Sequence, residues 1–170
     1  MTVKDRLLTK IAERKLEVAV FGIGYVGLPL AVAFAETGFS VTGVDTSCAR
    51  VNSINRGKSY IKDVSSAAIQ KMVTLGRLRA SVDYAAIAGA DALIICVPTP
   101  LRKTKDPDIT YIIAATDKIA EFGASDKLVI LESTTYPGTT EEVVQPRLSG
   151  KGDKVGQDFF LAFSPERIDP

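Results

Sequence analysis

Three glycines and one aspartate have the types and the spacing of a dinucleotide-binding site. Gly22, Gly24 and Gly27 follow an apolar run in the pattern G-x-G-x-x-G, and Asp45 comes about 20 residues later. A loop of this kind presents backbone N–H groups and the positive end of a helix dipole to a diphosphate. The carboxylate can accept hydrogen bonds from ribose hydroxyl groups, so the four residues together predict that the chain binds a dinucleotide.

Each of these residues has its own expected task. Gly22 permits a sharp turn, Gly24 lets the backbone approach a pyrophosphate, and Gly27 lets the following helix pack closely on the sheet. Asp45 would bind the adenosine ribose and repel a 2′-phosphate, which favours NAD over NADP as the cofactor. The alternative is a tight strand–helix turn that binds no ligand.

Alternating strand and helix segments are expected to position this glycine loop. The expected strands are 16–21, 39–44, 77–81, 92–97, 127–131 and 158–163, and the expected helices are 28–37, 47–55, 65–75, 84–88, 109–122 and one that Thr139 or Thr140 would cap. This alternation predicts an α/β fold, a Rossmann-type doubly wound sheet of six mainly parallel strands in the order 3-2-1-4-5-6. Residues 1–15 are expected to form a helix docked on this domain, which would span 16–170.

Polar side chains also follow the strands, at the sheet edge that binds ligands in open α/β folds. Thr99 follows the fourth strand and is either a cofactor contact or a turn hydroxyl. Arg50 either stacks on or pairs with the adenosine end of the cofactor, or it is a solvated charge. The charged loop 101–108 is either a contact for substrate phosphates or a solvated segment.

Composition excludes several other classes of protein. The chain has no histidine, which excludes a serine–histidine triad and a histidine metal cage within its 170 residues. A net charge of +1 and the lack of a long apolar run predict no nucleic-acid or membrane partner. Two cysteines without a C-x-x-C motif, and no signal peptide, predict a cytoplasmic location. No Tyr-x-x-x-Lys pair is present, which excludes a short-chain reductase or epimerase.

Four longer stretches extend the pattern: residues 21–30 (FGIGYVGLPL), 96–101 (CVPTPL), 132–140 (ESTTYPGTT) and 163–170 (FSPERIDP). In this combination the chain resembles the UDP-glucose/GDP-mannose dehydrogenase family, and within it the UDP-N-acetylglucosamine 6-dehydrogenase branch. The last stretch departs from the P-E-F-L form of the UDP-glucose enzymes. The expected substrate is therefore a UDP-N-acetylhexosamine.

The resemblance implies an activity and a set of site residues. Enzymes of this family oxidise the C6 alcohol of a nucleotide sugar to a carboxylate with two NAD, and they serve polysaccharide biosynthesis. Thr134 would lie near the reacting centre, and Glu166 would act as an acid–base or water-orienting residue. Without the resemblance, the two would be a helix-entry hydroxyl and a surface carboxylate. The expected cofactor contacts are Gly22, Gly24, Tyr25, Val26, Gly27, Asp45, Arg50, Pro98, Thr99, Ser133 and Thr134.

The resemblance also places part of the catalytic machinery beyond these residues. The nucleophilic cysteine, a lysine and an aspartate belong to a later region, with the central dimerisation helix and the C-terminal sugar-nucleotide domain. Cys96 is expected to be a buried core thiol, and Cys48 lies at a helix start with no base at hand. The chain is therefore expected to be the NAD-binding part of a homo-oligomeric enzyme and inactive alone. The alternative is a stand-alone NAD-binding or regulatory module without catalysis.

Overall fold

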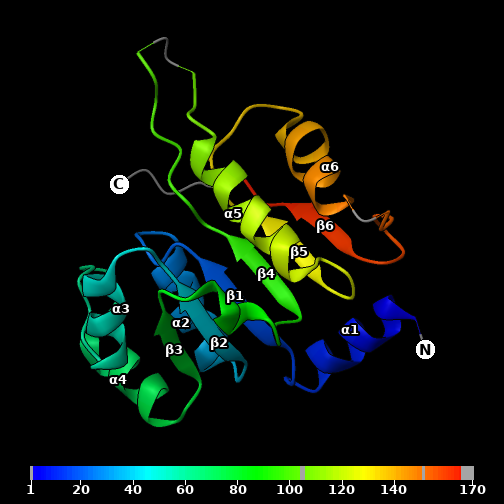
Figure 1. Cartoon of the computed structure of the whole chain (residues 1–170). Helices are drawn as coiled ribbons and strands as arrows, with labels where there is room; N and C mark the ends of the chain where they lie inside the picture. Colours follow the sequence, from blue (N-terminus) through cyan, green and yellow to red (C-terminus); the bar gives the residue numbers. More distant parts are fainter. Residues whose placement is uncertain (1, 104–105, 151, 166–170) are drawn as a thin grey trace.

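Six parallel strands form one sheet at the centre of the molecule (Figure 1). The computed structural model describes residues 2–103, 106–150 and 152–165. The strands are β1 (Glu17–Phe21), β2 (Ser40–Val44), β3 (Leu78–Ser81), β4 (Ala92–Ile95), β5 (Leu128–Leu131) and β6 (Phe160–Phe163). Their order is β3-β2-β1-β4-β5-β6, and every neighbouring pair is parallel. The predicted α/β fold and strand order are confirmed.

One helix precedes the first strand, and further helices and helical turns connect the strands. They are α1 (Val3–Ala12), α2 (Gly27–Glu36), α3 (Cys48–Asn55), α4 (Ser66–Thr74), the short turn η1 (Tyr84–Ile87), α5 (Thr110–Phe122), the π-helical turn η2 (Thr139–Val144) and α6 (Gln145–Leu148). Ser47 and Ser65 cap α3 and α4, since each hydroxyl accepts a hydrogen bond from a backbone N–H of the first turn. The prediction that Thr139 or Thr140 caps the next helix is wrong. Gly138 precedes η2 in a left-handed conformation, and the Thr139 hydroxyl donates to a carbonyl of the preceding turn instead.

The strand residues alternate between two cores, one on each face of the sheet. In β1, Val18 and Val20 belong to the core that α2 shares, whereas Ala19 and Phe21 belong to the core that α5 shares. All four are almost fully buried, as expected for a central strand of a parallel sheet. The loop that follows β1 therefore starts from a fixed point. Among the described residues, no helix has the length and the apolar character needed to cross a lipid bilayer.

One buried carboxylate fastens α1 to the rest of the domain. Asp91, just before β4, accepts hydrogen bonds from Arg6 Nη1 at 2.8 Å, from Lys10 Nζ at 2.7 Å and from the Glu17 N–H at 3.0 Å. Burial alone would raise the pKa of Asp91, but these hydrogen bonds outweigh it and hold the pKa below its ordinary value. Leu7, on the same helix, is buried in the core that α2 shares. Helix α1 thus packs on the domain through both charge and apolar contact.

Candidate dinucleotide site

The glycine loop lies between the end of β1 and the start of α2, at the carboxyl edge of the sheet (Figure 1). The chain runs from β1 outward to β2 and β3, and then returns to β4 on the other side of β1. In open α/β sheets, ligands bind in the crevice beyond such a reversal of strand order. The start of the loop is fixed because the Gly22 N–H donates to the Val44 carbonyl at 2.8 Å.

The three glycines of the loop are needed for different reasons. Gly22 has a φ of +86°, and a Cβ on it would lie 2.6 Å from the Cys96 carbonyl oxygen. A Cβ on Gly27 would lie 1.8 Å from the Gly22 carbonyl oxygen, so the fold itself excludes a side chain at both positions. Gly24 differs, because the nearest atom to a Cβ there would be Arg50 Nη1 at 4.0 Å. Protein packing does not require a glycine at this position, whereas the close approach of a ligand would.

Backbone N–H groups at the start of α2 are available to an anion. Those of Gly24, Tyr25, Val26 and Gly27 donate to no acceptor within the described part of the chain. Val26 is the N-cap residue, and its side chain offers no oxygen to cap the helix. Unpaired N–H groups and the positive end of the helix dipole both favour a bound anion such as a diphosphate.

Asp45, at the end of β2, lies against the loop with its side chain 7% exposed. Its Oδ2 accepts a hydrogen bond from the Ile23 N–H at 3.1 Å and lies 3.4 Å from Arg50 Nη1. Its Oδ1 accepts a hydrogen bond from the Ser47 N–H at 2.8 Å. A carboxylate has about four acceptor positions, so Asp45 retains one for a ribose hydroxyl. The Arg50 side chain is 46% exposed, so it can move aside and release another.

Tyr60 lies beside this carboxylate, and no sequence motif marks it. Its hydroxyl donates to the Ile23 carbonyl at 2.5 Å, and Arg50 Cζ lies 5.9 Å from the centroid of its ring. Tyr60 belongs to the connector between α3 and α4, 37 residues from Ile23 in the sequence. Asp45, Arg50 and Tyr60 therefore form a continuous set of contacts around the glycine loop.

The segments after β4 and β5 also lie at the carboxyl edge of the sheet. Ser133 is 3% exposed, and its hydroxyl donates to the Val97 carbonyl at 2.9 Å. The Ser133 hydroxyl is therefore already engaged within the protein. Pro98 and Thr134 are exposed and Thr99 is partly exposed, so these predicted cofactor contacts are accessible.

The other predicted residues divide into three cases. Cys96 is 7% exposed, as expected for a core thiol. Cys48 is exposed at the start of α3. Glu166 lies outside the described residues. Within those residues, no three cysteine, aspartate or glutamate side chains are grouped in a way that could hold a metal ion.

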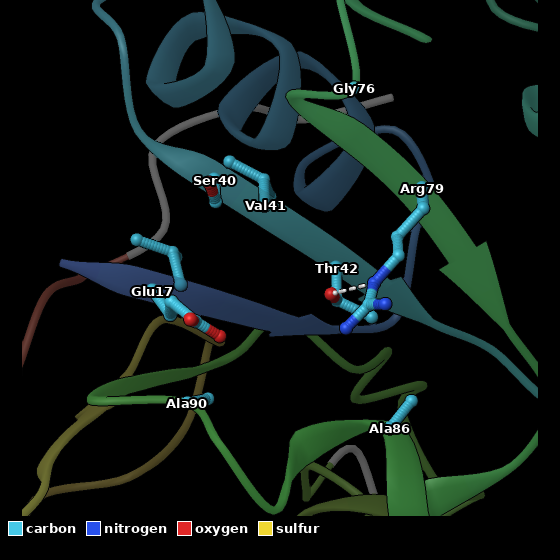
Figure 2. Close-up of a pocket in the computed structure, with 9 residues that line it drawn as sticks. Glu17, Ser40, Val41, Thr42, Gly76, Arg79, Ala86 and Ala90 are labelled. Carbon is cyan, nitrogen blue, oxygen red and sulfur yellow. Dashed lines mark hydrogen bonds between the residues drawn. The ribbon is translucent and has the colours of Figure 1, made fainter. Parts of the chain in front are cut away.

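A separate hollow lies near the starts of the strands (Figure 2). It has a volume of about 230 Å³ and is lined by the first residues of β1 and β2, by β3 and by the segment around η1. The Arg79 side chain extends from β3 toward β2, where its Nε donates to Thr42 Oγ1 at 2.9 Å. Glu17 and Ser40, which begin β1 and β2, also line the hollow, whereas the glycine loop follows the end of β1. The hollow is therefore distinct from the dinucleotide site.

Comparison with known proteins assigns this site to a family. Residues 16–170 match the UDP-glucose/GDP-mannose dehydrogenase family, NAD binding domain. The chain belongs to this family. It is 36% identical over 156 residues to UDP-N-acetyl-D-mannosamine dehydrogenase of Pyrococcus horikoshii, and this match covers 91% of this chain and 37% of the relative. It is 39% identical over 161 residues to the Escherichia coli (strain K12) enzyme of the same name, and this match covers 90% of this chain and 38% of the relative.

Solved structures of dehydrogenases from this family have the same fold. The P. horikoshii UDP-D-ManNAc dehydrogenase matches with a TM-score of 0.84 at 36% identity, over 91% of this chain and 37% of that one. A ternary complex of GDP-mannose dehydrogenase from Pseudomonas aeruginosa matches with a TM-score of 0.84 at 34% identity, over 89% of this chain and 36% of that one. The chain thus spans somewhat more than a third of the length of these relatives, and the predicted family and NAD cofactor are confirmed.

Proposed function

We propose that this chain is the NAD-binding part of a nucleotide-sugar 6-dehydrogenase. The complete enzyme oxidises the C6 alcohol of a UDP-sugar, a UDP-N-acetylhexosamine, to a carboxylate with two NAD. One observation carries the proposal: Gly24 is unobstructed where the N–H groups at the start of α2 meet the Asp45 carboxylate. This combination matches the needs of a diphosphate joined to a ribose.

The diphosphate binds to main-chain N–H groups. Those of Gly24, Tyr25, Val26 and Gly27 donate to no other described residue, so a ligand does not have to break existing hydrogen bonds. Gly22 contributes through the turn, because its surroundings leave no room even for a Cβ. The exposed side of the loop at Gly24 therefore receives the phosphate oxygens.

The adenosine end binds at Asp45. Its remaining acceptor position takes a ribose hydroxyl, and the negative charge repels the 2′-phosphate of NADP. Arg50 already contacts Asp45 and has a half-exposed side chain, so it can stack on the adenine or pair with the ligand.

The nicotinamide end extends toward the segments after β4 and β5. Pro98, Thr99 and Thr134 contact it there, together with the main chain of Ser133. Bound NAD supplies the hydride acceptor for oxidation of the sugar. Thr134 lies near the reacting carbon, and Glu166 acts as an acid–base or water-orienting group.

The choice of sugar rests on the relatives. Among the similar proteins are UDP-N-acetyl-D-mannosamine dehydrogenases and a UDP-N-acetyl-D-glucosamine 6-dehydrogenase of Pseudomonas aeruginosa. The remaining length of the enzyme supplies the nucleophilic cysteine, most of the sugar-nucleotide contacts and the surface that forms a homo-oligomer. We expect the complete enzyme to act in the cytoplasm and this chain to be inactive alone.

Calorimetric titration of the chain with NAD tests this proposal. We expect a saturable heat with NAD and weaker binding of NADP. We also expect no formation of NADH when a UDP-N-acetylhexosamine is added. The absence of a saturable signal at millimolar NAD would refute the proposed function. Turnover by the chain alone would refute the proposal that the remaining length of the enzyme supplies the nucleophilic cysteine.

A further inference from the structure

Two side chains from different parts of the chain hold the main chain of Ile23 in the glycine loop. Asp45, at the end of β2, accepts from its N–H at 3.1 Å. Tyr60, in the connector between α3 and α4, donates to its carbonyl at 2.5 Å. Both peptide groups that flank Ile23 therefore have a fixed orientation.

The orientation of each peptide group has a consequence for its other end. A trans peptide is planar, and its C=O and N–H point in opposite directions. The described part of the chain contains no cis peptide bond. The hydroxyl of Tyr60 holds the Ile23 carbonyl, so the Gly24 N–H must point away from Tyr60. This is one of the N–H groups that donate to no described residue.

The preceding peptide group supports this reasoning independently. Asp45 holds the Ile23 N–H, so the Gly22 carbonyl must point away from Asp45. That carbonyl oxygen is the atom that a Cβ on Gly27 would meet at 1.8 Å. The carbonyl thus points at the start of α2, which explains why the helix needs a glycine there.

Tyr60 is well suited to hold a carbonyl in place. Burial and the Asp45 carboxylate raise the pKa of the Tyr60 phenol, so the hydroxyl keeps the proton that it donates. The Arg50 guanidinium lies over the ring. The connector itself is fixed, since the Ser59 hydroxyl accepts from the Ile61 N–H and donates to the Ile61 carbonyl.

We propose that Tyr60 is a positioning residue of the cofactor site, whose hydroxyl directs the Gly24 N–H toward the diphosphate. The inference rests on the proposed function, because it requires that the loop binds NAD. It assigns to the connector between α3 and α4 a part in phosphate recognition that does not involve touching the ligand.

The substitution Tyr60→Phe tests this inference, because it keeps the ring under Arg50 and removes only the hydroxyl. We expect the Kd for NAD to rise roughly 2- to 12-fold, the effect of one lost hydrogen bond. Ser53→Ala is the matched control, since the Ser53 hydroxyl also donates to a main-chain carbonyl, that of Lys58, in the same part of the chain. We expect this variant to bind NAD as the parent does.

Amide NMR provides a readout that general loss of stability would not produce. ADP, which contains both the diphosphate and the ribose, is titrated into labelled parent and Tyr60→Phe chains. We expect the Gly24 N–H resonance to move downfield in the parent and less than half as far in the variant at saturation. The response of the Ser47 N–H, which reports on Asp45, should be unchanged.

The outcomes separate the two proposals. If the parent does not bind NAD, the proposed function fails and this inference fails with it. If the parent binds but Tyr60→Phe binds equally tightly, or its Gly24 resonance moves as far, Tyr60 has no positioning role and the proposed function stands. An equal loss of affinity in Ser53→Ala would also overturn the inference, because the effect would then come from the connector in general.

Discussion

Replacing Gly24 with alanine separates the requirements of the ligand from those of the fold. A Cβ at this position would have Arg50 Nη1 as its nearest neighbour, at 4.0 Å, which is ordinary contact or looser. The backbone at Gly24 is not in the left-handed region, so alanine introduces no strain of that kind. The added methyl group therefore enters only the space that the diphosphate is proposed to occupy.

The expected magnitudes follow from these distances. Gly24→Ala should change the free energy of unfolding by less than about 1 kcal/mol, since the alanine fits and the unfolded chain loses some freedom. It should weaken NAD binding roughly 10- to 100-fold, because charged hydrogen bonds to the phosphates are displaced. Gly27→Ala is the contrasting variant. Its Cβ would lie 1.8 Å from the Gly22 carbonyl oxygen, so the helix must move, and we expect a cost of about 3 kcal/mol or more.

Two measurements on the same protein samples decide the matter. Urea denaturation gives the free energy of unfolding, and calorimetry gives the Kd for NAD. Parent-like NAD affinity in Gly24→Ala would show that the ligand does not approach the loop at this position. A large loss of stability in Gly24→Ala would show that packing requires this glycine after all, and the reasoning from the Cβ distances would be refuted.

Three further predictions concern the carboxylates and the end of β5. Asp45→Asn should weaken NAD binding by about 1–3 kcal/mol and reduce the preference for NAD over NADP in competition titrations. An unchanged preference would show that the negative charge of Asp45 does not select between the two cofactors. Asp91→Asn should lower stability by about 1.5–3 kcal/mol at neutral pH. The folded-state pKa of Asp91 is depressed, so the contribution of Asp91 to stability is fully present above its ordinary pKa and is lost as the pH falls through its folded-state pKa. Urea denaturation below pH ~4 should therefore show a smaller difference in stability between variant and parent. Ser133→Ala should cost about 1 kcal/mol through the lost bond to Val97 and leave NAD binding near the parent value; a tenfold loss of affinity would mean that the hydroxyl contacts the ligand.

The parts of the fold that the sequence predicted well depend on local pattern. Strand β1 is an apolar run, α3 and α4 begin after serines, and Gly22 and Gly27 lie at the tight turn that their spacing indicates. The strand order follows from the alternation of strands and helices and from the handedness of parallel crossovers. These features require no knowledge of distant contacts.

The parts of the site that the sequence did not predict depend on contacts between distant residues. Tyr60 meets Ile23 across 37 residues, and no spacing rule connects a connector tyrosine with a loop carbonyl. The sequence likewise did not indicate that the Ser133 side chain is buried and bonded to the segment after β4, and its expected contact with the cofactor stays a prediction. The start of η2 was misplaced because a left-handed glycine, rather than a hydroxyl, sets its entry. For Tyr60 and Ser133 the decisive partner was fixed only by tertiary structure, whereas the entry of η2 is set locally by Gly138.

The attachment of α1 affects how the chain folds during its synthesis. Arg6 is separated from Asp91 by 85 residues and from its second acceptor, the Asp126 carbonyl, by 120. At about 5–20 residues per second, translation exposes α1 for several seconds before Asp91 has been made. A helix of 10 residues is shorter than the ~12–15 that an isolated helix needs in water, so α1 is not expected to hold its shape during that interval. Helix α1 thus becomes ordered only after synthesis has passed Asp91, 85 residues beyond Arg6.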